Sequence, residues 1–93
     1  MSEENTIYIG KKSTMNYVMA CFTVLQTNPK KLILKARGRS ISKAVDVLEI
    51  LKNRFIKDKI DKINITTGTD NITSESGGTF NMSTIEIEVI LKK

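Results

Sequence analysis

Apolar positions recur along this chain with two different periods, and the changes of period divide it into six elements. Apolar residues at three- and four-residue spacing predict two helices, and β-favouring or alternating runs predict four strands. The strands are expected at residues 6–9, at residues 31–36, and around Ile63 and Ile65 as far as Gly68. The last strand has the cleanest alternation, with inward positions at Ile85, Ile87, Val89 and Leu91.

The two predicted helices each carry one apolar stripe. The first is expected to begin at Ser13 or Thr14, either of which can cap it, and to end before the break at residues 27–29. Its stripe consists of Met15, Val18, Met19, Phe22 and Leu25. The second helix is expected to begin with a cap at Ser40 or Ser42, and its stripe consists of Ile41, Ala44, Val45, Leu48, Leu51 and Phe55. Val47 and Ile50 widen this stripe beyond what one sheet face needs.

The resulting order is βαβαββ, which predicts one α/β domain over residues 1–93. We expect a two-layer sandwich in which two helices cover a four-stranded mixed sheet. Each βα unit favours parallel pairing of its strands, and the last two strands favour an antiparallel hairpin. The segment from Thr69 to Asn81 is polar and contains Gly77 and Gly78, so we expect it to form a long hairpin tip.

The composition excludes several classes of function. Cys21 is the single cysteine and there is no histidine, which excludes an internal disulfide, the usual zinc sites and nucleophile–histidine pairs. We therefore expect neither an enzyme nor a bound metal or cofactor, and we expect Cys21 to be half-buried on its helix. The apolar runs are too short to span a membrane, and the acidic start is unlike a signal peptide, so we expect no membrane association and a cytoplasmic location.

The net charge of +5 is concentrated in the middle of the chain. Residues 30–62 contain eleven lysines and arginines against four acids, whereas residues 63–93 are net acidic. A basic segment in such a domain indicates a polyanionic partner, most simply nucleic acid, with an acidic protein or membrane surface as the alternative.

Two basic clusters follow predicted strands. Arg37 and Arg39 flank Gly38, which can adopt positive φ at a sharp turn, and a helix begins directly afterwards. Lys11 and Lys12 similarly precede the first helix. The amide groups of a helix N-terminus add positive potential, so both clusters suit phosphate, although each is also compatible with a solvated basic loop.

Several motifs resemble the Alba family of small archaeal chromatin proteins. They cover nearly the whole chain in the family's order: Gly10-Lys11-Lys12 with Met15-Asn16-Tyr17-Val18, the run from Lys35 to Asp46, Asn53-Arg54-Phe55, and Ser83-Thr84-Ile85-Glu86-Ile87. The resemblance implies the βαβαββ fold, a homodimer, and binding of double-stranded DNA and RNA with little sequence preference. It also implies association with the chromosome.

The resemblance assigns roles to particular residues. Lys11 and Lys12 match a basic pair that contacts nucleic acid and that can be acetylated. The phosphate-contacting loop is matched by Arg37 and Arg39, and Tyr17 either flanks the same surface or packs beneath it. The contacts between neighbouring dimers on DNA are matched by Arg54 and Phe55, although Phe55 also falls on the apolar stripe and could be plain core.

One departure from the family concerns the hairpin, which is usually basic. Residues 69–81 contain no lysine or arginine, and Asp70 and Glu75 are their only charges. The leading hypothesis is a non-enzymatic protein that coats and organises chromosomal DNA through phosphate contacts and also binds RNA. The alternatives are a component of an RNA-protein complex and a scaffold that binds an acidic protein.

Overall fold

Four strands form one mixed sheet in the order β1-β2-β4-β3, in a computed structural model that describes residues 5–92. Strand β1 (Thr6–Tyr8) pairs in parallel with β2 (Lys31–Arg37). Strand β4 (Thr79–Leu91) pairs antiparallel with β2 on one side and with β3 (Ile60–Thr73) on the other.

The predicted parallel pairing is therefore confirmed for the first βα unit and wrong for the second. Strand β4 lies between β2 and β3, so these two strands never pair. The inward side chains of β4 explain its central place, because Ile87 and Val89 are fully buried beneath the helices. An alternating strand with such an apolar face stabilises the domain most when the layer above covers it completely.

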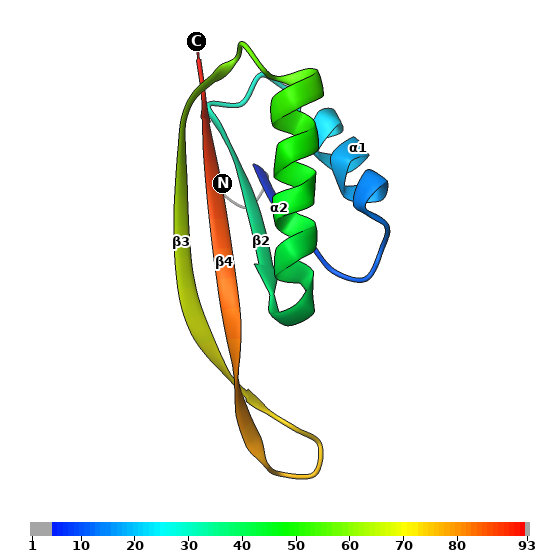
Figure 1. The fold of residues 1–93 in the computed structure, drawn as a ribbon, viewed down its shortest axis with the longest axis vertical. Helices are drawn as coiled ribbons and strands as arrows, with labels where there is room; N and C mark the ends of the chain where they lie inside the picture. Colours follow the sequence, from blue (N-terminus) through cyan, green and yellow to red (C-terminus); the bar gives the residue numbers. More distant parts are fainter. Residues whose placement is uncertain (1–4, 93) are drawn as a thin grey trace.

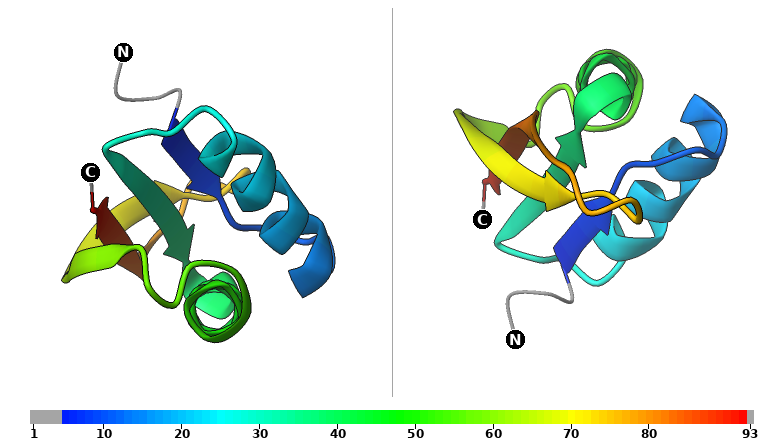
Figure 2. Two further views of the ribbon diagram at one scale, coloured as in Figure 1. Left: turned by 90° about the horizontal axis from the view of Figure 1, so that it is seen from above. Right: turned by 90° about the horizontal axis from the view of Figure 1, so that it is seen from below.

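Both helices lie on one face of the sheet and leave the other face open (Figures 1 and 2). Helix α1 (Thr14–Leu25) is capped by Ser13, whose hydroxyl accepts a hydrogen bond from the Asn16 amide at 3.3 Å. Helix α2 (Ile41–Ile50) follows a 3₁₀ turn at Gly38–Ser40 and continues as one π turn at Leu51–Phe55. The predicted serine cap of α2 is wrong, because Ser40 precedes the helix without a side-chain cap hydrogen bond.

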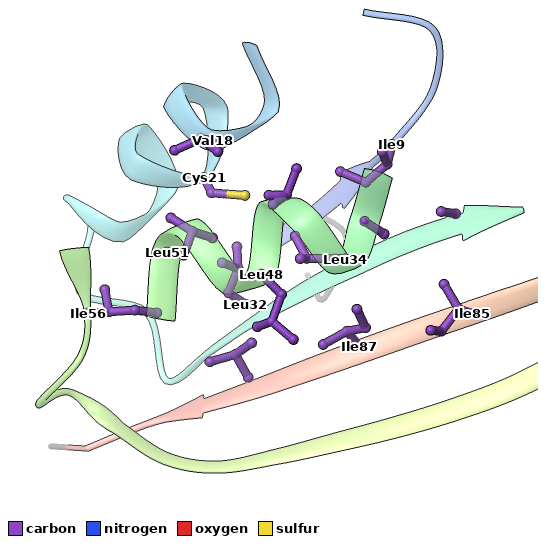
Figure 3. Packing of buried hydrophobic residues seen from close by; sticks show 14 residues of the cluster. Ile9, Val18, Cys21, Leu32, Leu34, Leu48, Leu51, Ile56, Ile85 and Ile87 are labelled. Atoms are coloured by element: carbon purple, nitrogen blue, oxygen red, sulfur yellow. The ribbon is translucent and has the colours of Figure 1, made fainter. Parts of the chain in front are cut away.

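The core lies between the two helices and the inner face of the sheet (Figure 3). Its fully buried side chains include Leu32, Leu34, Leu51, Ile87, Val18, Val47, Val89 and Cys21. The Cys21 thiol is thus fully buried and not half-buried, and loss of hydration raises its pKa to about 12. It packs as a small apolar group.

The helix stripes predicted from spacing are partly wrong. On α1 the buried positions are Val18, which the predicted stripe contained, and Cys21, which it did not. On α2 Val45 of the stripe is 39% exposed, whereas Val47, which widened the stripe, is buried. Large side chains of the predicted stripes remain at the surface, namely Met15, Met19, Phe22 and Phe55. The buried face of α1 is the one with the smaller residues, because they allow the helix to approach its neighbours closely.

The predicted long hairpin between β3 and β4 is confirmed, but most of its polar segment is a paired, two-stranded arm and not an unpaired tip. Pairing between β3 and β4 continues from Thr69 opposite Ser83 to Thr73 opposite Thr79, so only residues 74–78 form the turn. Threonine and isoleucine suit extended backbone even where no core covers them. Figure 1 shows this arm projecting beyond the helices, and the molecule is 47 Å long and 23 Å wide.

Candidate nucleic-acid interface

The two basic clusters lie at the same end of the sheet, where the parallel strands β1 and β2 both finish. Lys11, Lys12, Arg37 and Arg39 together are called the basic edge below. Strands β1 and β2 run in parallel with Tyr8 opposite Lys35, and the Ile9 amide donates a hydrogen bond to the Lys35 carbonyl at 2.8 Å. The chain then leaves β1 through Lys11 and Lys12, and leaves β2 through Arg37 and Arg39, all four exposed. Parallel pairing thus brings together two loops that are about 25 residues apart in sequence.

Tyr17, on the first turn of α1, binds the backbone of the loop that follows β1. Its phenolic oxygen accepts hydrogen bonds from the backbone amides of Gly10 at 2.9 Å and Lys12 at 3.1 Å. A side chain at residue 10 would have its Cβ 3.3 Å from this oxygen, so glycine permits the close approach. The half-buried Tyr17 is placed to orient the two lysines.

Lys43 holds the same loop from the side, and sequence reasoning did not single it out. Its ammonium donates to the carbonyls of Gly10 at 2.8 Å and Lys12 at 2.7 Å, and lies 5.9 Å from the centre of the Tyr17 ring. These contacts join the first turn of α2 to the loop before α1. The basic motif that begins at Lys35 contains this lysine, but its spacing could not reveal that it binds backbone 33 residues away.

The turn between β2 and α2 is fixed by Gly38. This residue has φ of 56°, as the sequence indicated, and a Cβ there would lie 3.1 Å from the Met82 sulfur. Another side chain would be strained in this conformation and would meet the base of the arm. The arginine turn is therefore packed directly against the point where β4 leaves the arm.

The arginine turn also forms an ion pair with the arm. A guanidinium nitrogen of Arg37 lies 3.6 Å from a carboxylate oxygen of Asp70, with both side chains more than half exposed. No ion pair within residues 5–92 involves Arg39, Lys11 or Lys12. Three cations at this edge are thus open to an anion, and the fourth is already neutralised in part.

The arm itself is nearly uncharged. Asp70 lies at its base and Glu75 in the turn, and Asn71 and Asn81 form a cross-strand hydrogen bond of 3.1 Å between their side chains. The turn is closed by backbone bonds from the Ser74 amide to the Gly78 carbonyl and from Gly77 to Ser74. Such an arm offers hydrogen-bonding groups without a cationic contribution.

Arg54 and Phe55 belong to the π turn Leu51–Phe55, which continues α2 at the end opposite to the arginine turn. The Phe55 ring is 39% exposed and lies 5.5 Å from the Phe22 ring, centre to centre. The two rings border a hollow of about 370 Å³ that Lys30, Lys59 and Lys92 also line. The structure therefore contains two separate candidate surfaces, a basic edge and an aromatic hollow.

Residues 5–92 contain neither a group of three acidic, cysteine or histidine side chains that could hold a metal ion nor a helix that could cross a membrane. The comparison with known proteins then decides the family. The model of the Alba family matches residues 5–69. The chain belongs to the Alba family.

Known Alba proteins are similar over nearly the whole chain. The DNA/RNA-binding protein Alba of Thermoplasma volcanium is 51% identical over 88 residues, which cover 94% of this chain and 96% of that protein. The structure of Alba from Thermoplasma volcanium superposes with a TM-score of 0.79 at 47% identity, covering 92% of this chain and 99% of that one. ALBA1 from Trypanosoma brucei has the same fold, with a TM-score of 0.71 at 23% identity over 97% of this chain and 71% of that chain.

The segment that matches the Alba family contains the basic edge and leaves most of the arm outside. Residues 5–69 include both basic clusters, Tyr17 and Lys43, and end one residue before Asp70. The predicted βαβαββ order and mixed sheet are confirmed for this Alba chain.

Proposed function

We propose that this chain is a non-enzymatic nucleic-acid-binding protein that coats chromosomal DNA through phosphate contacts and also binds RNA. The observation that carries the proposal is the basic edge, where Lys11, Lys12 and Arg39 form no ion pair with any described residue. Hydrogen bonds from Lys43 and to Tyr17 hold the backbone of the lysine loop in place. Phosphate contacts need cations but no base-reading groups, so little sequence preference is expected. The relative from Thermoplasma volcanium is named for binding of both DNA and RNA.

The proposal places Arg37 and Arg39 in direct contact with phosphate. Replacing both with alanine should weaken binding to a duplex DNA oligonucleotide and reduce the slope of log affinity against log salt by about 0.9 for each lost contact. Fluorescence anisotropy at several salt concentrations measures both quantities. Replacing Lys57 and Lys59 together with alanine is the matched control, since it also removes two cations, from the exposed turn that follows the other end of α2. Unchanged binding of a folded double variant would contradict this surface.

A homodimer is part of the proposal, because a two-fold axis would present the basic edge twice on one DNA. The helix layer leaves Met15, Met19, Phe22, Val45 and Phe55 at the surface, which is more large apolar area than a solvated face needs. Phe55 and Arg54 then serve in contacts between neighbouring dimers. Sedimentation equilibrium of the free protein tests the dimer, and a monomer at micromolar concentration would contradict it.

Acetylation of Lys11 or Lys12 would tune this binding, because it removes one of the unpaired cations of the edge. Among the alternatives, a complex with RNA shares the same surface and is separated by competition of duplex DNA against structured RNA. An acidic protein partner would survive nuclease treatment during purification, whereas nucleic acid would not.

A further inference from the structure

The face of the sheet without helices has a hollow of about 640 Å³ at the end where the arm begins. Figure 2 shows both helices on the other side, so neither covers this face. Outside the hollow, polar side chains on this face pair with one another across the strands, such as Lys31 with Glu88 at 3.4 Å. The Asn64 amide, which donates a hydrogen bond to Glu88, and then Lys31 lower the pKa of that carboxyl. Such a polar face is suited to water or a polar ligand and not to a core.

The strand register places one row of four side chains across the hollow. Tyr8 lies opposite Lys35, Lys35 opposite Glu86, and Glu86 opposite Thr66, so the row crosses all four strands. Tyr8, on the edge strand β1, is 62% exposed, and the Lys35 ammonium lies over its ring, 5.9 Å from the ring centre and 3.5 Å from a Glu86 oxygen. The hollow therefore has an exposed aromatic side chain at one wall, with the ammonium of a half-exposed lysine over its ring.

The next row of paired residues toward the arm adds a second cation, Arg37, and a glycine without a side chain at the bottom of the hollow. Arg37 lies opposite Thr84, and Thr84 opposite Gly68. A Cβ at residue 68 would approach the Thr84 hydroxyl to 3.0 Å, so a side chain there would occupy the floor that glycine leaves open. Arg37 borders this hollow and also belongs to the basic edge, which makes the two surfaces continuous.

From this arrangement we propose that the hollow binds an unpaired nucleobase of single-stranded nucleic acid, which stacks on Tyr8 while its phosphate contacts Arg37. The inference rests on the proposed nucleic-acid binding and extends it. A paired base in a duplex has its faces covered by its neighbours, so only an unpaired base can use the ring. The carboxylates of Glu86 and Asp70, already paired with Lys35 and Arg37, can accept hydrogen bonds from donors on the base edge.

Three probes distinguish the ligands: a 15-nucleotide oligouridine, a 15-nucleotide oligothymidine and a duplex DNA of the same length. Tyr8→Leu keeps a side chain of similar apolar character but removes the π face. It should weaken binding of both single strands by roughly fivefold or more, since fivefold is the smallest loss expected when one base no longer stacks. Binding of the duplex should be unchanged. Tyr8→Phe should restore wild-type binding, since the stacking surface returns.

A second variant tests the floor without touching the ring. Gly68→Thr introduces a strand-favouring residue that fills the hollow, and it should also weaken single-strand binding selectively. Equal loss for duplex and single strands, or no loss in either variant, would overturn the inference. Selective loss of one single strand would assign the hollow to RNA or to DNA and support it. Wild-type protein that binds single strands through Tyr8 but no duplex would keep this inference and contradict the proposed coating of DNA.

Discussion

Lys43 and Tyr17 hold the same three-residue loop through opposite backbone groups. The lysine donates to the carbonyls of Gly10 and Lys12, while the tyrosine oxygen accepts from the amides of the same two residues. All four polar backbone groups of this loop edge are thus satisfied by two side chains that also contact each other. The position of Lys11 and Lys12 is therefore set by α1 and α2 together, before any ligand arrives.

We expect Tyr17→Phe to loosen this loop. The substitution removes the acceptor for two backbone amides, one of them half-buried, and should lower the free energy of unfolding by about 1–3 kcal/mol. Urea unfolding followed by circular dichroism measures this. Affinity for duplex DNA should also fall while its salt slope stays the same, because no cation is lost. Tyr8→Phe is the matched control, and an equal effect of both variants would contradict the role of the Tyr17 oxygen.

Lys12→Gln and Lys11→Gln, which imitate acetylation, should each reduce duplex affinity. Each removes one unpaired cation and should make the salt slope shallower by about 0.9 if that lysine contacts a phosphate. Salt titrations of binding give both values. Lys57→Gln removes the same charge from the exposed turn beyond α2 and should have a smaller effect on the slope. A slope that depends equally on all three lysines would indicate a diffuse charge effect instead of local contacts.

Asp70→Asn should strengthen duplex binding. The carboxylate lies 3.6 Å from Arg37 and competes with phosphate for its guanidinium, so neutralising it frees a cation at the basic edge. The salt slope should become steeper, and binding isotherms at two or more salt concentrations measure the change. Glu75→Gln makes the same charge change in the arm's turn, far from the arginine, and should have little effect. Weaker binding of Asp70→Asn would show that the pair orients Arg37 productively.

Phe55→Ala should reduce cooperative binding along DNA more than it reduces stability. The ring is 39% exposed, so its loss should cost less than the about 3–5 kcal/mol typical of a buried aromatic residue. Leu51→Ala, four residues earlier and fully buried, is the control and should cost about 2–5 kcal/mol. Thermal unfolding and gel-shift titrations on long DNA separate the two effects. A large stability loss with intact cooperativity would place Phe55 in the core.

Cys21 should resist thiol reagents while the domain is folded. Burial raises the pKa of its thiol to about 12, so at pH 9 the side chain stays protonated and is also inaccessible. The unfolded chain has a normal thiol, so folding stabilises the protonated form and this contribution is lost as the pH rises from the unfolded pKa toward 12. Reaction with a disulfide reagent at pH 9, with and without urea, tests this. Rapid reaction of the folded protein would contradict burial.

The sequence by itself determined the order of the elements and the position of the basic edge. Strand alternation in β4, the Ser13 cap and the glycine at the arginine turn are local properties of neighbouring residues, so their structure followed from them directly. The sequence also placed both basic clusters at the ends of strands, because each cluster directly follows a β-favouring run. Parallel pairing of β1 with β2 was expected from the βα unit and brings the clusters together.

Only the tertiary structure decided which apolar residues are buried and what holds the loops. Met19 and Val18 both fit helical stripes, and close packing against α2 and the sheet selected the smaller Val18. The arm forms because β3 and β4 satisfy each other's backbone groups, although its residues have no apolar core. The contacts of Lys43 with Gly10 and of Arg37 with Asp70 join residues 33 positions apart, and a local pattern carries no information about pairs at that separation.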